Sequence, residues 1–224
     1  MPRSELATAR ELAAIIGIRH EIVNTAEFDN PDYLKNGGDR CFHCKDELYS
    51  RIETLLPQLG APIMVSGANL DDRGDYRPGL TAAADHGVRH PLQEAGFTKA
   101  DVRELARHWN LPTWDKPASP CLSSRLAPGL AVTPERTKRI EDAETYLRSL
   151  GLRECRVRYH EGDLARIEVP LDELPRFASP ESRMNLSREL HRLGFKFVTL
   201  DLDGFRSGSL NELVPLELKS RYAS

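Results

Sequence analysis

The sequence predicts an α/β fold made of two parts, and two observations predict it. In the first part, short apolar segments alternate with amphipathic helical segments, a pattern typical of a parallel sheet covered by helices on both faces. In the second part the pattern becomes helix, two strands, helix and strand, which indicates a small α+β unit. A chain of 224 residues forms one large or two modest domains. We place the boundary in APGLAVT, giving domains 1–128 and 129–224.

The first part is expected to begin with a helix followed directly by a strand, which is an unusual start for an α/β domain. Gly17 suits the end of that helix, and Thr98 and Asp101 have the spacing of a capping box. The elements expected in chain order are a helix at 4–16, a strand at 20–23, a helix through 45–56, a buried strand at 61–67, a helix at 79–86 and a helix after Thr98.

The second part is expected to open on a long helix capped by Thr133, with Pro134 in its first turn. Strands follow at RVRYH and LARIEV, then the helix MNLSRELHRL and the strand FKFVTLDL. Along the first of these strands, alternation directs Cys155 inward and Arg156 and Arg158 outward. Cys155 is therefore interpreted as a core residue.

Charge and hydropathy exclude several classes of partner. The net charge is −3, from 31 basic and 34 acidic residues, which argues against binding nucleic acid through bulk charge. No run of 18 apolar residues predicts a transmembrane helix, so no membrane partner is expected. The N-terminus MPRSELATAR lacks the apolar core of a signal peptide, which predicts a cytoplasmic protein.

Cys41 and Cys44 form a C-x-x-C pair where a loop enters a helix, and Cys121 follows in a distant loop. Three interpretations fit this spacing. The cysteines can be small buried hydrophobic residues, or they can bind zinc together with His43. Alternatively, three thiolates can hold a [4Fe–4S] cluster and leave one iron open to an exogenous ligand such as sulfide.

The loop from Ser66 to Asp72 follows a predicted strand, and ligands of open α/β sheets lie beyond the carboxyl ends of strands. Gly67 permits close approach of a backbone, while Asn69 and Asp72 can hold polar ligand groups or a metal-bound phosphate. An ordinary polar turn with Asx hydrogen bonds is the alternative interpretation.

Two further segments carry groups suited to anions. In PASPCLSSR the prolines stiffen the backbone around Cys121, and Ser124 and Arg125 offer anion contacts. Arg156 and Arg158 share one face of their strand and can meet one anion, and Arg206 lies in a tight-turn motif. The alternatives are an interdomain linker for the first segment and a solvated polar face for the strand pair.

Taken together, seven stretches resemble the LarE-type sulfur transferases, a branch of the PP-loop ATP pyrophosphatases. They are GANLDDRGDYRPGL, PLQEAGFTKADVRELA, PASPCLSSR, AETYLRSLG, RVRYH, LARIEVP and VTLDLDGFRSG. They follow the family's order over nearly the whole chain. The resemblance implies a parallel-sheet, adenine-nucleotide-hydrolase-like domain at 1–128 and an α+β substrate or assembly domain at 129–224.

The resemblance also implies an activity. Family members use ATP, with Mg²⁺, to turn a carboxylate of a pyridinium-3,5-dicarboxylate mononucleotide into an acyl adenylate. Sulfur then displaces AMP to give a thiocarboxylate, which matures into a nickel-pincer cofactor. Some members give up a cysteine sulfur, whereas others carry three cysteines on an iron–sulfur cluster, as Cys41, Cys44 and Cys121 suggest here. The sulfur donor stays open, and multimers in the family imply a homo-oligomer.

The family's functional residues transfer onto matching positions of this chain. The implied catalytic residues are Cys121, Arg125 and Glu144; those beside the nucleotide are Gly67, Asn69, Asp72, Arg77 and Ser124; those that bind the substrate phosphate are Arg156, Arg158 and Arg206; and the cluster ligands are Cys41, Cys44 and Cys121. A second acidic residue of the family's sulfur centre has no counterpart, because Arg176 falls at its position and Asp172 only nearby.

The largest departure from the family is its pyrophosphate-binding loop, S-G-G-x-D-S, which these 224 residues do not contain. We therefore expect an N-terminally truncated or mis-started form, with Met1 as an internal or alternative start, that is impaired in activating its substrate.

Two rival functions remain. A tRNA thiolase of the same superfamily would need a basic face, whereas residues 135–224 hold 16 basic and 16 acidic side chains. A non-catalytic, zinc-stabilised module is the other.

Overall fold

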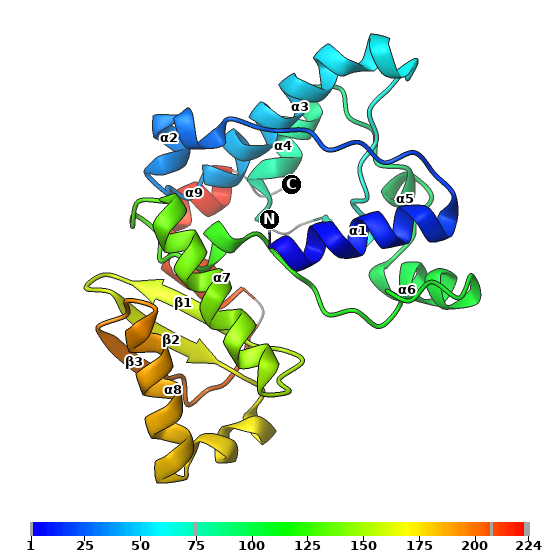
Figure 1. Ribbon diagram of the computed structural model, residues 1–224. Helices are drawn as coiled ribbons and strands as arrows, with labels where there is room; N and C mark the ends of the chain where they lie inside the picture. The colour runs from blue at the N-terminus through cyan, green and yellow to red at the C-terminus, as the bar shows by residue number, and fades with distance from the viewer. Residues whose placement is uncertain (1, 74–75, 207, 222–224) are drawn as a thin grey trace. The chain divides into compact units, whose positions relative to one another are not determined.

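The computed structural model describes residues 2–73, 76–206 and 208–221, and its elements are labelled in Figure 1. It is a mixed helix and sheet structure, in agreement with the predicted α/β class at this coarse level. The chain forms two compact units, which are described in turn. The first comprises Arg3–Ala118 with Pro215–Ser224, and the second comprises Ser119–Val214 with Met1–Pro2. The boundary expected at 128/129 concerns the domains of the family and not these compact units, and it stays a prediction.

The first unit is mainly helical among its described residues. Its α-helices are α1 (Arg3–Ile16), α2 (Pro31–Leu34), α3 (Arg40–Leu59), α4 (Pro78–Asp85), α5 (Pro91–Glu94), α6 (Lys99–His108) and α9 (Leu216–Arg221), with 3-10 turns η1 (Glu27–Asp29) and η2 (Leu70–Asp72). Gly17 ends α1 with a φ of +77°, and Thr98 and Asp101 form the predicted capping box of α6. No helix in the described part of the chain combines the length and apolar character needed to cross a membrane.

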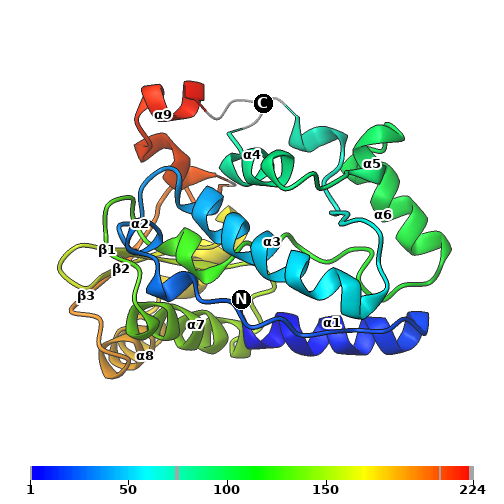
Figure 2. The same ribbon diagram turned by 90° about the horizontal axis from the view of Figure 1, so that it is seen from above.

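The core of the first unit lies between α3 and α4. Its buried members are Tyr49, Met64, Ala82, Ala83 and Val88, with Phe42, Ile52 and Leu56 packed against them. Small alanine side chains let the two helices approach closely, which explains the Ala-rich sequence of α4. Figure 2 shows the two helices from above.

Two strand predictions for the first unit need correction. The strand expected at 20–23 is wrong, because residues 18–26 have no regular secondary structure. The strand expected at 61–67 is reduced to a single parallel bridge from Val65 to Arg89. Strand pairing depends on partners elsewhere in the chain, and among the described residues these segments find one bridge in place of the expected parallel sheet.

The second unit contains a three-stranded sheet. Its elements are η3 (Leu122–Arg125), α7 (Pro134–Ser149), β1 (Arg156–His160), β2 (Leu164–Glu168), η4 (Leu171–Phe177), α8 (Pro180–Arg192), β3 (Phe197–Leu200) and η5 (Ser209–Leu213). The strand order is β1-β2-β3, with β1 antiparallel to β2 and β2 parallel to β3. The predicted strands and helices of this unit are confirmed, including the cap that Thr133 provides for α7.

The two faces of this sheet differ in character. Val157, Tyr159, Ala165 and Ile167 form an apolar face, and Figures 1 and 2 show α7 and α8 along the same side of the sheet. Those helices contribute the buried side chains Ile140, Ala143, Leu147, Leu186 and Leu190. Because side chains alternate along a strand, the neighbouring positions of β1 and β2 point to the opposite face. That opposite face carries the charged residues of the candidate site.

Candidate functional site

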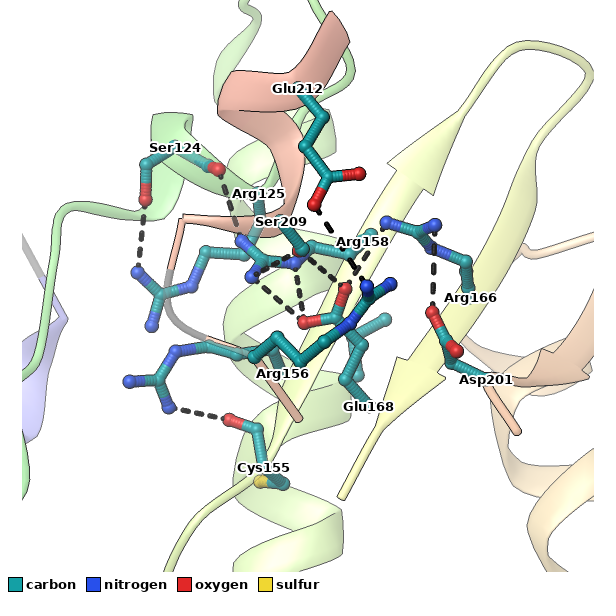
Figure 3. Close-up of polar contacts among 12 residues, drawn as sticks. Ser124, Arg125, Cys155, Arg156, Arg158, Arg166, Glu168, Asp201, Ser209 and Glu212 are labelled. Carbon is teal, nitrogen blue, oxygen red and sulfur yellow. Dashed lines mark hydrogen bonds and ion pairs between the residues drawn. The ribbon is translucent and has the colours of Figure 1, made fainter. Parts of the chain in front are cut away.

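Three arginines and a glutamate share the second face of the sheet, which we call the polar face. Arg156 and Arg158 stand two residues apart on β1, and Arg166 and Glu168 do so on β2. The antiparallel register places Arg158 opposite Arg166 and Arg156 opposite Glu168. Figure 3 shows Arg158, Arg166 and Glu168 projecting toward one another, whereas the guanidinium group of Arg156 points to the Cys155 carbonyl oxygen. The pairing of β1 with β2 thus brings three guanidinium groups to one surface.

Glu168 is the centre of this arrangement, and its side chain is fully buried. Its Oε2 atom lies 2.9 Å from Nε and 2.8 Å from Nη2 of Arg158. Its Oε1 atom accepts hydrogen bonds from Arg166 Nη2 at 3.1 Å and from the Ser209 hydroxyl at 2.8 Å. One carboxylate therefore holds two arginines in fixed positions, and their charges exceed its own.

The two arginines that flank Glu168 keep further donors at this face. Arg158 also donates from Nη1 to the Ser124 carbonyl oxygen at 3.3 Å and from Nη2 to the Ser209 hydroxyl at 3.1 Å. Arg166 reaches Asp201 at 3.5 Å, and its Nε atom is buried with no hydrogen-bond partner among the described residues. A buried donor without an acceptor is costly, so this atom is the least satisfied donor described for the two arginines.

Arg156 is buried as well, with 6% of its surface exposed. Its Nη1 atom donates to the Cys155 carbonyl oxygen at 2.7 Å, and its guanidinium group lies 5.0 Å from the centre of the Phe205 ring. Burial, followed by the charge of Arg125, lowers the pKa of Arg156. Arg156 and Arg158 share one face of β1 as predicted, and the alternative of a solvated polar face does not hold, because both side chains are buried.

A second buried ion pair fixes the loop that carries Cys121. Arg125 is completely buried and contacts Glu144 of α7 through Nε–Oε1 at 3.0 Å and Nη2–Oε2 at 3.3 Å. Its Nη1 atom donates to the carbonyl oxygens of Pro120 and Cys121 at 2.5 Å and 2.9 Å. Glu144 also accepts from Arg148 at 2.8 Å. These contacts hold η3 against α7, and direct contact of Arg125 with substrate stays a prediction.

Arg206, predicted to join the arginine pair, is about half exposed. Its guanidinium group lies 3.4 Å from Asp203 Oδ2 and 3.9 Å from Glu212 Oε1. Its neighbour Ser207 lies outside the described residues. Within the second unit, the structure therefore gathers Arg156 and Arg158 around the polar face and pairs Arg206 with two exposed acidic side chains.

The predicted nucleotide residues of the first unit form a self-contained turn. Asn69 and Asp72 form a capping box around η2, with hydrogen bonds of 3.0 Å from Asp71 N to Asn69 Oδ1 and from Asn69 N to Asp72 Oδ2. Arg77 lies 2.9 Å from Asp72 Oδ1. The space above Gly67 is open, because an added Cβ would meet no atom within 4 Å. The Asx turn is thus present, and nucleotide binding stays a prediction.

The cysteines divide between the units. Cys41 and Cys44 lie in the first turns of α3, as predicted, and are partly buried, with Arg40 Nη2 3.5 Å from Cys41 Sγ. Cys121 is an exposed free cysteine just before η3 in the second unit. Cys155 is the buried core residue predicted from the strand pattern, and burial raises the pKa of its thiol to about 11. The described residues of neither unit alone gather three metal ligands.

Comparison with known proteins gives three relatives that match most of the chain. An uncharacterised protein of Synechocystis is 44% identical over 210 residues, which cover 94% of this chain and 78% of that protein. The pyridinium-3,5-bisthiocarboxylic acid mononucleotide synthase of Lactiplantibacillus plantarum, LarE, is 40% identical over 215 residues, covering 93% and 77%. The chain belongs to the LarE family. An uncharacterised protein of Methanocaldococcus jannaschii is 27% identical over 194 residues, and no family model matches.

Sequence reasoning missed three residues of the polar face in this LarE-family protein. Arg166 and Glu168 lie in the stretch LARIEVP, and Ser209 follows the GFRSG motif. The available signal was their spacing, since residues two apart on a strand share a face. Applying that rule to the second strand as well as to the first would have placed Arg166 and Glu168 beside the arginine pair.

Proposed function

We propose that this LarE-family chain transfers sulfur to the carboxylates of a pyridinium-3,5-dicarboxylate mononucleotide and forms thiocarboxylates. The observation that carries the proposal is the 40% identity, over 93% of the chain, to a pyridinium-3,5-bisthiocarboxylic acid mononucleotide synthase. The polar face supports it, because its buried guanidinium groups suit a phosphate monoester.

Arg156 and Arg158 are proposed to hold the phosphate of the mononucleotide, with Arg166 as a third contact. In the described part of the chain the buried Nε donor of Arg166 has no acceptor, and Glu168 fixes the guanidinium groups of Arg158 and Arg166 before any ligand arrives. Binding the phosphate away from the reacting carbon uses binding energy to orient the carboxylate. Arg206 is the third arginine predicted to bind the phosphate, and to do so its exposed guanidinium group must move away from Asp203 and Glu212.

The carboxylate must be activated before sulfur can attack, because its carbon is electron-rich and oxide is a poor leaving group. In the proposed route a carboxylate oxygen attacks the α-phosphorus of Mg²⁺-bound ATP and pyrophosphate leaves. A sulfur nucleophile then attacks the acyl carbon, and the bond from that carbon to the AMP oxygen breaks. Gly67, Asn69, Asp72, Arg77 and Ser124 are the residues proposed beside the nucleotide.

The cysteines fit the proposed three-thiolate [4Fe–4S] site in their chemistry. Cys41 and Cys44 are partly buried and Cys121 is exposed, whereas Cys155 is buried with a raised pKa and is unsuited to be a ligand. Cys41 and Cys44 stand one helical turn apart in α3. The cluster, when bound, would supply sulfide for transfer. Arg125 and Glu144 are proposed to position the loop that presents Cys121.

The decisive assay supplies the pyridinium dicarboxylate mononucleotide, ATP, Mg²⁺ and a sulfur source to anaerobically purified protein with its iron and sulfide contents measured. The expected products are AMP, pyrophosphate and a mononucleotide in which sulfur replaces carboxylate oxygen, seen by mass spectrometry. The Arg156→Ala and Arg158→Ala variants should lose product, whereas the surface variant Lys138→Ala should not. When tRNA is added as a competing acceptor, sulfur transfer to tRNA with none to the mononucleotide would contradict the proposal.

The same assay tests the proposed cluster ligands. Sulfur transfer should be lost in the Cys41→Ala and Cys121→Ala variants, because each removes one of the three proposed thiolates. Full sulfur transfer by both variants, with unchanged iron and sulfide contents, would contradict the ligand assignment.

A further inference from the structure

A surface pocket of the first unit lies along α6 and is lined by none of the residues assigned above, although its Lys99 donates from N to Asp71 Oδ2 of η2 at 2.9 Å. Its volume is about 540 Å³, and we call it the α6 pocket. It is lined by Lys99, Ala100, Arg103, Glu104, Arg107, Trp114 and Asp115. The volume falls within the range of roughly 300–1,000 Å³ that is usual for pockets binding small molecules.

Three cations line the pocket from one side of α6. Lys99, Arg103 and Arg107 follow one another at intervals of four residues, which places them along a single stripe of the helix. Such a row of long basic side chains suits a phosphate group, which accepts several charge-assisted hydrogen bonds at once. Glu104 and Asp115 also line the pocket, and their carboxylates suit the hydroxyl groups of a sugar.

An indole ring completes the pocket. Trp114 has 42% of its surface exposed, and the Arg107 guanidinium group lies 5.9 Å from its ring centre. The loop that carries Trp114 is held to α6, because Arg103 Nη2 donates to the Lys116 carbonyl oxygen at 3.2 Å. Trp114 N also donates to the Leu111 carbonyl oxygen at 3.2 Å. A held, exposed indole offers a stacking surface for a planar ring.

We propose that the α6 pocket is a binding site for a mononucleotide. The cations would hold the phosphate, Glu104 and Asp115 would accept hydrogen bonds from the ribose, and the base would stack on Trp114. The inference rests on the pocket alone and does not depend on the sulfur-transfer proposal. Its test is therefore a binding measurement that requires no turnover.

The test uses the Trp109→Phe variant, which leaves Trp114 as the single tryptophan of the chain. AMP is expected to quench the Trp114 fluorescence saturably, because the base stacks on the indole. Adenosine, which lacks the phosphate, and ribose 5-phosphate, which lacks the base, are each expected to bind about tenfold or more weakly, since each loses one group of contacts. Quenching by adenosine as strong as by AMP would overturn the phosphate assignment, and so the proposal.

Variants in the same background test the lining residues. Lys99→Ala is expected to weaken AMP binding about tenfold, the effect of one charge-assisted contact. The matched control Lys138→Ala removes an exposed lysine of the second unit and should leave binding unchanged. A second control, Arg51→Ala, removes an exposed arginine of the first unit and should also leave the Trp114 signal unchanged. Absence of saturable quenching, or equal weakening in Lys99→Ala and the two controls, would overturn the proposal.

Discussion

The polar face of the second unit and the Asn69–Arg77 segment of the first unit carry similar polar residues in opposite environments. Arg156, Arg158 and Glu168 are buried, and Glu168 receives contacts from two strands and from η5. In the Asn69–Arg77 segment, Asn69 and Asp72 satisfy the backbone of their own turn, and Arg77 is about half exposed. The first region collects its charges from distant parts of the sequence, whereas the second uses neighbouring residues.

This difference indicates which region is organised before a ligand binds. Charges removed from water are held by hydrogen bonds at fixed positions, and their interaction with an anion is screened less than at the surface. An exposed, self-capped turn must still rearrange or be joined by other groups before it encloses a ligand. We therefore assign the strongest ligand contribution to the polar face and expect the variants below to separate the two regions.

The largest effect on stability is expected for Glu144→Gln. This change keeps the shape of the side chain but leaves the buried guanidinium group of Arg125 without its carboxylate. Loss of one partner of a buried ion pair costs about 3–5 kcal/mol of unfolding free energy. Urea unfolding measures it, and replacing both residues by methionine should recover part of the loss. A cost below about 1 kcal/mol for Glu144→Gln would contradict the view that this buried pair holds η3 against α7.

The next effect concerns ligand affinity at the polar face. Arg158→Ala removes a guanidinium group proposed to contact the phosphate, and a charge-assisted hydrogen bond contributes about 1.5–3 kcal/mol, or roughly 10- to 150-fold in affinity. Calorimetric titration with the pyridinium mononucleotide checks this. The matched control is Arg192→Ala, which removes an exposed arginine paired with Glu189 on α8. Equal weakening in both variants would point to nonspecific charge attraction.

Much of the second unit could be predicted from its sequence because its signals are local. Thr133 caps α7, and alternation along RVRYH and LARIEV places their residues on two faces. The burial of Arg156 and Arg158 could not be predicted from the residues next to them in the sequence. The burial of Arg158 involves η3 and η5, which lie far from β1 in the sequence, so alternation along the strand predicts a shared face but not whether that face is covered.

The first unit was harder to predict because its strands depend on partners. Helices α4 and α6 carry their own signals, namely the alanines of α4 and the capping box of Thr98. The strand expected at 20–23 has no described partner, and Val65 has a single bridge to Arg89. The roles of Cys41, Cys44 and Cys121 could be inferred only from family resemblance, because C-x-x-C spacing fits several kinds of site.

A smaller effect is expected from pH in the first unit. His86 lies 3.0 Å from Asp46 and 2.9 Å from Glu53 of α3, and these carboxylates raise its pKa above the ordinary 6.5. The protonated form is favoured in the folded state. Its stabilisation is therefore fully present below pH 6.5 and is lost as pH rises through the raised pKa.

Thermal unfolding of the parent protein and of His86→Gln checks this prediction. Glutamine does not titrate, so the difference between the two proteins should be larger at about pH 5.5 than at about pH 8.5. A difference independent of pH would show that the contacts of His86 act only through their shape and hydrogen bonds.

The smallest effect is expected at the exposed turn of the first unit. Arg77→Ala removes the ion pair with Asp72, in which the Arg77 side chain is 49% exposed. Pairs of this kind contribute about 1 kcal/mol or less. Urea unfolding at low and high salt measures the change. A loss as large as that of Glu144→Gln would remove the contrast between the two regions.

The central claim, that the arginines of the polar face bind the phosphate of a mononucleotide, is tested most directly by calorimetry with two ligands. The pyridinium dicarboxylate mononucleotide should bind the parent protein, and the corresponding nucleoside, which lacks the phosphate, should bind far more weakly. In the Arg156→Ala, Arg158→Ala double variant the two ligands should bind equally weakly. A nucleoside that binds the parent protein as tightly as the mononucleotide would contradict the account.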